Sequence, residues 1–177
     1  VVSLNPKIEI NSLVFKYLKS IQSPNVSPLG SAFPDSQLLY PPKLIQIMGQ
    51  LSRNRHSYDQ TSNLPPGNLA LRKLIAQRYC MQGIPTDADD IVITSGGLEA
   101  LNLSLQAITL PGDYILLQQT IFYGAWQAAE RLGLKVITLP EHPQHGFDIE
   151  AFEQVIKNYP IKVCWFMLNA HNPIGFT

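Results

Sequence analysis

Four consecutive residues, Ser95-Gly96-Gly97-Leu98, have the composition of an anion-binding turn. They follow the strand-like run 91–94 and precede a pattern of apolar residues at helical spacing that extends to residue 108. The first backbone N–H groups of a helix have no partner within the helix, and glycine lets a phosphate group approach them closely. The stretch therefore predicts a phosphate cradle. An ordinary tight turn between strand and helix is the alternative.

Two further turns carry groups that suit a planar, phosphorylated ring. Residues 119–123 include the aromatic side chains Phe122 and Tyr123, and residues 169–175 include the amide Asn172 in an Asn-Pro-x-Gly sequence. Each turn follows a strand-like run, and ligands of open α/β sheets bind beyond the carboxyl ends of the strands. Core packing at a helix start and a plain Asn-Pro turn are the alternatives. His171 is set aside as a surface or second-shell histidine.

The elements that would position these turns alternate regularly from residue 91 onward. We expect strands over 91–94, 114–118, 134–138 and 162–168, and helices over 97–108, 122–132 and 149–158. This alternation contains no hairpin signal, so it predicts an α/β fold with a mainly parallel sheet and helices on both faces. The preceding part reads as three helices: Asn11 caps the first, Pro41-Pro42 opens the second and Asn68 caps the third. Asp148 is the expected cap of helix 149–158.

The composition is that of a globular protein without a dominant charge. Of the 177 residues, 45% are hydrophobic, and 13 basic side chains balance 13 acidic ones. This balance gives the chain no overall attraction for nucleic acid or an anionic membrane, and no apolar run approaches a membrane span. Cys80 and Cys164 have no metal-ligand spacing. We therefore expect buried structural thiols, no metal site and a cytoplasmic location.

Several short motifs follow one another along nearly the whole chain: Tyr58, Pro66-Gly67, Leu71-Arg72, Thr94-Ser95-Gly96-Gly97, Pro111-Gly112-Asp113 and Asn172-Pro173-Ile174-Gly175. In order and approximate spacing they resemble fold-type-I pyridoxal-phosphate (PLP) aminotransferases. Within that superfamily, the segments Pro28–Asp35, Glu99–Leu103 and Phe166–Pro173 are closer to the aminotransferase-like domain of MocR-type GntR transcriptional regulators. The resemblance implies the N-terminal half of a fold-type-I PLP-dependent transferase large domain.

The resemblance also implies roles for the candidate residues near the predicted cradle. Gly97 and Leu98 would donate backbone N–H groups to the PLP phosphate, and Ser95 and Gly96 would line the same turn. Phe122 would stack on the pyridine ring, with its neighbour in the chain as the alternative stacking residue. The expected cofactor is therefore PLP.

Three more roles follow from the resemblance. Asn172 would hydrogen-bond the ring hydroxyl of PLP. Tyr58 corresponds to a tyrosine that reaches the phosphate of the neighbouring subunit's cofactor, which implies a homodimer; an aromatic packed on its own protomer is the alternative. Gly30 corresponds to a glycine near a substrate carboxylate, with a simple turn as the alternative.

The resemblance divides the chain into an N-terminal helix and extended arm, residues 1–45, and the N-terminal part of the PLP-binding large domain, residues 46–177. PLP chemistry needs a lysine for the aldehyde, an aspartate for the pyridine nitrogen and usually an arginine for the substrate carboxylate. By family order these residues follow the Asn-Pro-x-Gly turn. We expect the chain to stop before the lysine, and we assign no catalytic residue within it.

Three classes of function compete for this sequence. The first is the PLP-binding, effector-sensing domain of a MocR-type regulator, with a DNA-binding winged helix upstream and an amino acid or amine as effector. The second is a class I/II aminotransferase that moves an amino group between an amino acid and a 2-oxo acid. The third, a nucleotide-binding domain without PLP, is disfavoured because no acidic residue follows the glycine turn as a ribose-binding fingerprint requires. Whether transaminase activity is retained stays open.

Overall fold

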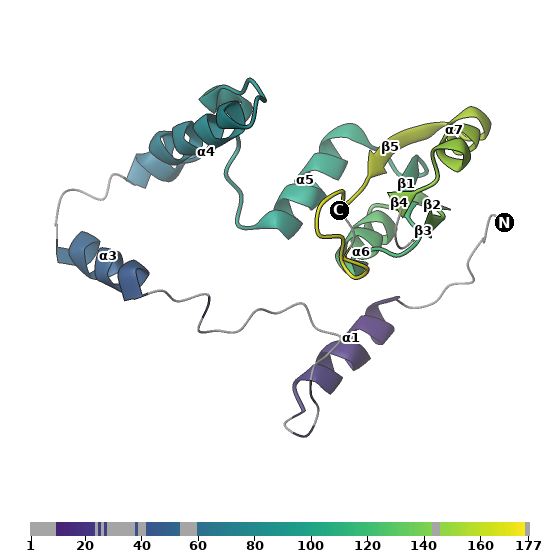
Figure 1. Ribbon diagram of the computed structural model, residues 1–177, viewed down its shortest axis with the longest axis horizontal. Helices are drawn as coiled ribbons and strands as arrows, with labels where there is room; N and C mark the ends of the chain where they lie inside the picture. The colour runs from purple at the N-terminus through teal and green to yellow at the C-terminus, as the bar shows by residue number, and fades with distance from the viewer. Residues whose placement is uncertain are drawn as a thin grey trace. The chain divides into compact units, whose positions relative to one another are not determined.

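The computed structural model describes residues 10–23, 25, 27, 38, 42–53, 60–142 and 146–175. The chain divides into two compact units. Figure 1 labels their helices and strands. Unit 1 contains residues 1–32 and 100–177, and unit 2 contains residues 33–99. The division into an arm, 1–45, and a large domain, 46–177, stays a prediction about the whole protein.

A three-stranded parallel sheet forms the centre of unit 1. Strands β1 (Tyr114–Gln118), β2 (Lys135–Leu139) and β5 (Ile161–Trp165) lie in the order β2-β1-β5. The middle strand, β1, is shielded from water by β2 and β5 on its two sides and by helices on both faces of the sheet, and Leu116 is fully buried. Its apolar sequence suits this position. The predicted parallel sheet is confirmed.

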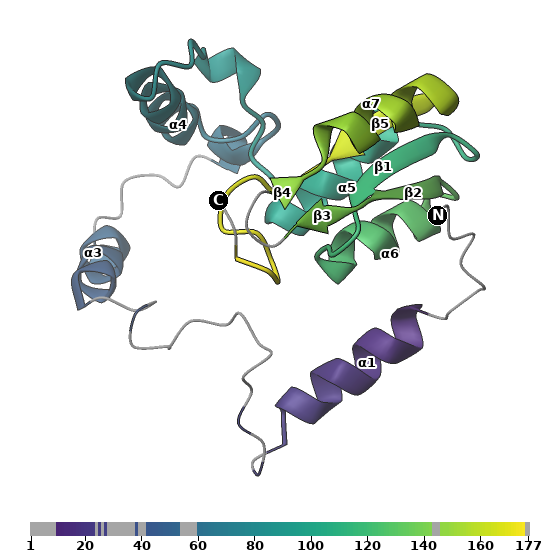
Figure 2. The same ribbon diagram turned by 45° about the vertical axis from the view of Figure 1, so that its right-hand side comes forward.

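Helices cover both faces of this sheet, with α6 (Tyr123–Arg131) on one side and α7 (Ile149–Asn158) on the other (Figure 2). Successive side chains of a strand point to opposite faces. Ile115 and Leu117 of β1 therefore pack with α6 and with the part of α5 (Gly97–Ile108) that lies in unit 1, whereas Leu116 packs with α7. The prediction of helices on both faces is confirmed.

A short antiparallel pair of strands follows β2, and the sequence does not predict it. β3 (Glu141–His142) pairs with β4 (Gly146–Phe147). Two-residue strands are too short to show the alternation of apolar and polar residues that predicts a hairpin. After β4, Asp148 caps α7 by accepting hydrogen bonds from the N–H groups of Glu150 and Ala151 at 2.8 and 3.2 Å.

The first helix of unit 1 is α1 (Ile10–Ile21). Asn11 lies inside this helix rather than at its N-cap, which corrects the predicted start. The Asn11 side chain instead accepts a hydrogen bond of 2.7 Å from Nε2 of Gln127 in α6, and Val14 is buried. The side chain of Asn11, which the sequence predicted as a helix cap, thus makes a tertiary contact with α6 instead.

Unit 2 consists of helices and irregular chain in its described part. Its elements are α3 (Pro42–Arg53), η1 (Gln60–Asn63), α4 (Leu69–Met81) and η2 (Ala88–Asp90). Asn68 caps α4 as predicted, by accepting a hydrogen bond from the N–H of Leu71 at 3.1 Å. The predicted strand 91–94 is wrong for the described residues, because these residues pair with no strand there. Ile93 instead donates one backbone hydrogen bond, to the Pro66 carbonyl at 2.9 Å.

The described surface differs from expectation at the cysteines. Cys80 and Cys164 are both exposed, so the prediction of buried thiols is wrong. Cys164 lies on β5, which is an edge strand of the described sheet, and the partial burial there raises the pKa of its thiol through desolvation.

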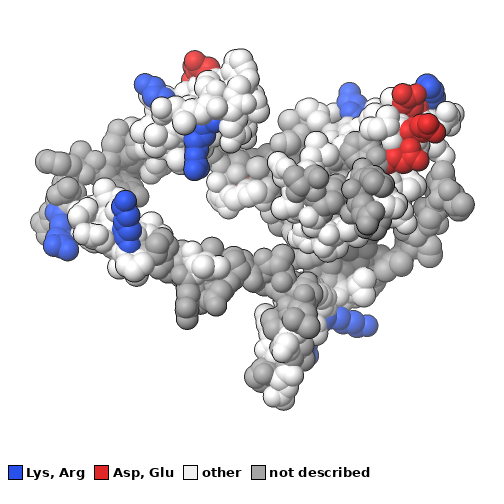
Figure 3. Space-filling model, in the orientation of Figure 1, with Lys and Arg blue, Asp and Glu red and all other residues white. Residues whose placement is uncertain are grey.

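On the face drawn in Figure 3, the described Lys and Arg side chains are dispersed. Among the described helices, none has the length and apolar character needed to cross a membrane.

Candidate functional site

The Ser95-Gly96-Gly97 turn leads into α5 as the sequence predicts. Gly96 has a φ of +128°, which favours glycine, and a Cβ added at Gly96 or Gly97 would meet no atom within 4 Å. The Ser95 N–H donates a hydrogen bond to the Glu99 carboxylate, and the Thr94 hydroxyl donates to the Gly96 carbonyl at 3.0 Å. The turn therefore combines open space, a helix N-terminus and a backbone N–H that already holds a carboxylate, which is the chemistry of an anion site.

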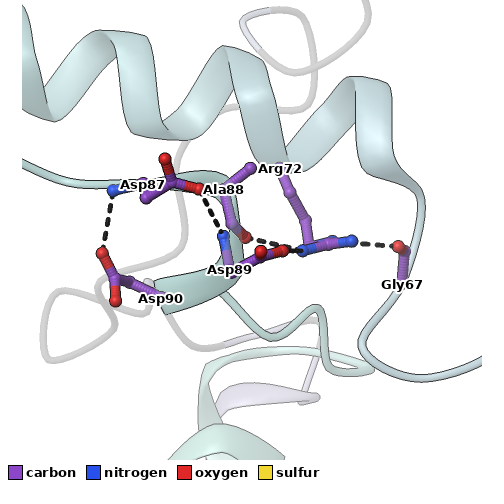
Figure 4. Close-up of polar contacts among 6 residues, drawn as sticks. All are labelled: Gly67, Arg72, Asp87, Ala88, Asp89 and Asp90. Carbon is purple, nitrogen blue, oxygen red and sulfur yellow. Dashed lines mark hydrogen bonds and ion pairs between the residues drawn. The ribbon is translucent and has the colours of Figure 1, made fainter.

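Arg72 of α4 joins the turn before its own helix to the chain that leads into segment 91–94 (Figure 4). Its side chain is only 8% exposed. The guanidinium donates to the Gly67 carbonyl at 3.1 Å, the Ala88 carbonyl at 2.7 Å and the Asp89 carboxylate at 3.1 Å. The planar guanidinium has several donors in a fixed geometry, so one side chain can join two separate segments. Arg72 thereby helps to position the segment that leads to the glycine turn.

An open groove of about 660 Å³ lies between α4, η2 and segment 91–97. Its walls are mainly apolar and include Leu71, Ile75, Tyr79, Ile84, Ile91 and Ile93. Gly96 and Gly97 also line it. The glycine turn of unit 2 therefore has an apolar wall beside it as well as its backbone N–H groups.

Phe122 and Asn172 follow two paired parallel strands of unit 1, β1 and β5. Phe122 is half-buried and precedes the first residue of α6, and its ring centroid lies 4.6 Å from that of Tyr123 at a tilt of 45°. Asn172 is half-buried and directly follows His171, which is 1% exposed. Because the carboxyl ends of parallel strands meet at one edge of a sheet, the aromatic pair and the amide follow the same edge.

A buried polar network joins the loops that follow β1 and β5. Gln118, the last residue of β1, is fully buried; its Nε2 donates to Oε1 of Glu141 at 2.7 Å, and its Oε1 accepts from the Met167 N–H at 2.6 Å. The second oxygen of Glu141 accepts from the Thr120 N–H at 2.9 Å. Nε2 of His171 lies 3.3 Å from Oε1 of Glu141. The carboxylate is thus removed from water among hydrogen-bond donors, as a buried charge requires.

The chain is similar to known transcriptional regulators and to solved aminotransferases. No family model matches the chain. The α-aminoadipate aminotransferase LysN of Thermus thermophilus, solved in complex with N-(5'-phosphopyridoxyl)-L-leucine, has a similar fold, with a TM-score of 0.71 over 93% of this chain and 43% of that one at 24% identity. Two HTH-type transcriptional regulators of Escherichia coli K12 are also similar: YdcR is 45% identical over 176 residues, and YjiR is 33% identical over 166. The chain belongs to the aminotransferase-like domains of MocR-type regulators, within the fold-type-I superfamily.

This MocR-type domain corresponds to part of each relative. The alignments cover 99% and 92% of this chain but only 38% of YdcR and 35% of YjiR. The fold and the family therefore apply to the domain itself.

The candidate residues of the MocR-type domain belong to different parts of the structure. The turn Ser95-Gly96-Gly97-Leu98 lies in unit 2, whereas Phe122 and Asn172 lie in unit 1. Tyr58 and Gly30 lie outside the described residues. Topology thus brings Phe122 and Asn172 to one sheet edge, and the ligand roles of all these residues stay predictions.

Gln118, Glu141 and His171 are the candidates that sequence reasoning missed or set aside. Gln118 carried a signal, since it is a polar residue at the end of an apolar strand-like run, where a buried amide must find partners. Glu141 carried no local signal, because it lies 23 residues from Gln118. His171 is buried, which corrects its assignment as a surface residue and leaves the second-shell alternative.

Proposed function

We propose that this domain binds PLP and senses an amino acid or amine for a GntR/MocR-type transcriptional regulator whose DNA-binding winged helix lies upstream. The observation that carries the proposal is the 45% identity, over 176 residues, to a protein named as an HTH-type transcriptional regulator. The chain has no net charge, which supports DNA contact through another domain. A DNA-binding regulator of a bacterial type would act in the cytoplasm, and we propose a homodimer.

The PLP phosphate would lie at Ser95-Gly96-Gly97-Leu98. The open space beside Gly96 and Gly97 and the N-terminus of α5 support this assignment, because backbone N–H groups and the helix dipole favour an anion there. The Glu99 carboxylate already accepts a hydrogen bond in this turn, so it would have to share or yield the Ser95 N–H.

The ring of PLP would contact the loops that follow β1 and β5. Phe122 would stack on the pyridine ring and exclude water from one face, and the Asn172 amide would hydrogen-bond the ring hydroxyl. Tyr58 would reach the phosphate in the neighbouring subunit, and Gly30 would lie near the carboxylate of an effector. Bound PLP would supply an aldehyde that reacts reversibly with primary amines, which is why the proposed effectors are amino acids or amines.

The proposal is tested on the intact protein by titrating it with PLP and following the visible absorption of the cofactor. We expect saturable PLP binding that Gly97→Asp weakens at least about tenfold, because a carboxylate in the cradle repels a phosphate dianion. Gln154→Asp is the matched control: it adds a carboxylate at an exposed position of α7, outside the proposed cradle, so it should change the affinity little.

The regulatory part is tested by the anisotropy of labelled DNA from upstream of the protein's own gene, with PLP present. We expect binding to this DNA, and we expect one or more amino acids or amines to change its affinity. Failure of the intact protein to bind PLP would overturn the cofactor assignment. Rapid transamination together with no DNA binding would instead favour the aminotransferase alternative.

A further inference from the structure

The network around Glu141 connects two loops through their backbones. Glu141 accepts from the Thr120 N–H, in the loop after β1, and Gln118 accepts from the Met167 N–H, in the loop after β5. The two side chains bond each other at 2.7 Å, so the two loops are joined through a pair of adjacent side chains. His171 approaches the same carboxylate from the second loop.

The tethered amides stand close in sequence to the proposed ligand contacts. Thr120 precedes Phe122 by two residues, and Met167 precedes Asn172 by five. The side chain of His171, the residue directly before Asn172, also lies against Glu141. A displacement of either tethered backbone would therefore move the aromatic ring or the amide proposed to hold the PLP ring.

Stability alone is a poor explanation for this network. The side chains of Glu141 and His171 are 2% and 0% exposed, and Gln118 is fully buried. Desolvating a carboxylate costs several kcal/mol, and well-packed apolar side chains often serve stability as well or better. What apolar side chains cannot do is hold a particular backbone N–H at a particular place, because dispersion contacts are not directional.

We propose that Glu141 and Gln118 are positioning residues that set the relative placement of the loops carrying Phe122 and Asn172. The consequence for PLP rests on the proposed function. The placement of the loops rests only on the hydrogen bonds from Thr120 and Met167. Neither Glu141 nor Gln118 contacts the ligand in this proposal.

The two residue types can be exchanged to test it, because the network needs one donor facing one acceptor. In Glu141→Gln, two amides face each other, and in Gln118→Glu, two carboxylates face each other. The double variant Gln118→Glu/Glu141→Gln restores one donor and one acceptor with reversed direction, and it leaves an oxygen for each backbone N–H. The exposed Glu153→Gln on α7 is the control for loss of a negative charge.

Hydrogen exchange at the amides of Thr120 and Met167 is the first measurement, made on the intact protein without PLP. We expect at least about tenfold faster exchange at both amides in each single variant, because two like groups that face each other weaken the hold of the side chains on the N–H groups of Thr120 and Met167. The double variant should recover most of the protection, and Glu153→Gln should match the wild type. Unchanged exchange in Glu141→Gln, or a double variant no better than the singles, would overturn the proposal. Should Gln118→Glu not fold, Glu141→Gln and the double variant still decide it.

The second measurement is the absorption spectrum and affinity of bound PLP at a temperature where every variant is folded. A positioning role predicts a shifted cofactor band and about tenfold weaker binding in Glu141→Gln, with recovery in the double variant. A merely structural role would lower the unfolding temperature and leave the spectrum unchanged, which would overturn the link to the ligand. If the wild type binds no PLP, the proposed function is wrong, whereas the exchange data still decide whether these residues hold the loops.

Discussion

Single buried polar side chains organise both units of this domain. In unit 2, the Arg72 guanidinium satisfies two backbone carbonyls, and in unit 1 the Gln118 amide satisfies one backbone N–H and one carboxylate. In each case a planar group with fixed donor directions joins segments that are distant in the sequence. The effect of removing such a group depends on what it leaves unpaired, not on how many bonds it makes.

Replacement of Arg72 tests this distinction directly. Arg72→Ala should lower the free energy of unfolding by about 2–4 kcal/mol, because the buried Ala88 carbonyl and the partly buried Gly67 carbonyl lose their donor. Asp89→Asn should cost no more than about 1 kcal/mol, since the Asp89 side chain is 89% exposed and exposed ion pairs contribute little. Urea denaturation of the wild type and the two variants measures both changes in the free energy of unfolding. Equal costs for the two variants would show that the ion pair, rather than the carbonyls, gives Arg72 its role.

Replacement of Asn172 tests the proposed contact with the PLP ring. In the intact protein, Asn172→Ala should shift the cofactor absorption band and weaken PLP binding about two- to tenfold, because a neutral hydrogen bond contributes about 0.5–1.5 kcal/mol net. The phosphate would stay anchored at the glycine turn. A PLP titration followed by absorption measures both effects. An unchanged spectrum together with unchanged affinity would count against this role for Asn172.

The segments between regular elements are positioned by close backbone contacts. Gly67 has a φ of +104°, and a Cβ placed there would lie 2.6 Å from Cβ of Ile93. The Ile93 N–H also donates to the carbonyl of Pro66. Glycine at position 67 thus allows the turn before α4 to lie directly against the segment that leads to the glycine turn of the candidate site.

Two glycine substitutions separate the steric contact from backbone strain. Gly67→Ala should cost about 3 kcal/mol or more, because the new Cβ overlaps an atom next to the Ile93 backbone and the left-handed φ disfavours alanine. Gly83→Ala shares a positive φ, +81°, but its Cβ would meet open space, so it should cost about 1–2 kcal/mol. Denaturation midpoints compare the two. If both variants lose the same stability, the contact with Ile93 does not constrain this turn.

For the whole molecule, many large apolar side chains of the described residues face solvent. Phe15, Leu110 and Met81 are 71%, 73% and 80% exposed. The chain also corresponds to less than half the length of its regulator relatives. Apolar surface of this extent is typical of faces that pack against other protein.

The 177-residue chain on its own should therefore self-associate. Burial of exposed apolar side chains between copies stabilises such association by roughly 25 cal/mol per Å². Sedimentation velocity over a concentration series should show a weight-average mass that rises with concentration. A monomer at every concentration would mean that the exposed side chains do not form an adhesive surface.

The intact protein should instead form a defined two-fold dimer. The resemblance places Tyr58 and the segment after Gly30 in a site shared by two subunits, and an isologous interface closes at two copies. Sedimentation equilibrium of the PLP-bound protein should give twice the mass of one subunit. A PLP-bound monomer at micromolar concentration would contradict the shared site.

Local elements of this protein could be derived from the sequence because their causes are local. Helix α5 has the predicted bounds, 97–108, and Asn68 and Asp148 cap α4 and α7, since capping and helical periodicity involve residues within a few positions. The regular alternation of strands and helices likewise predicted the parallel sheet around β1, because a parallel connection requires a crossover.

Tertiary structure decided the contacts that no local pattern encodes. Segment 91–94 has strand-like residues, but strand pairing requires a partner, and none lies beside it among the described residues. Gln118 meets Glu141 and Met167 from 23 and 49 residues away. The sequence indicates that a buried amide must find partners, but the path of the chain selects them, because hydrogen bonds between distant segments form only after the sheet has brought those segments together.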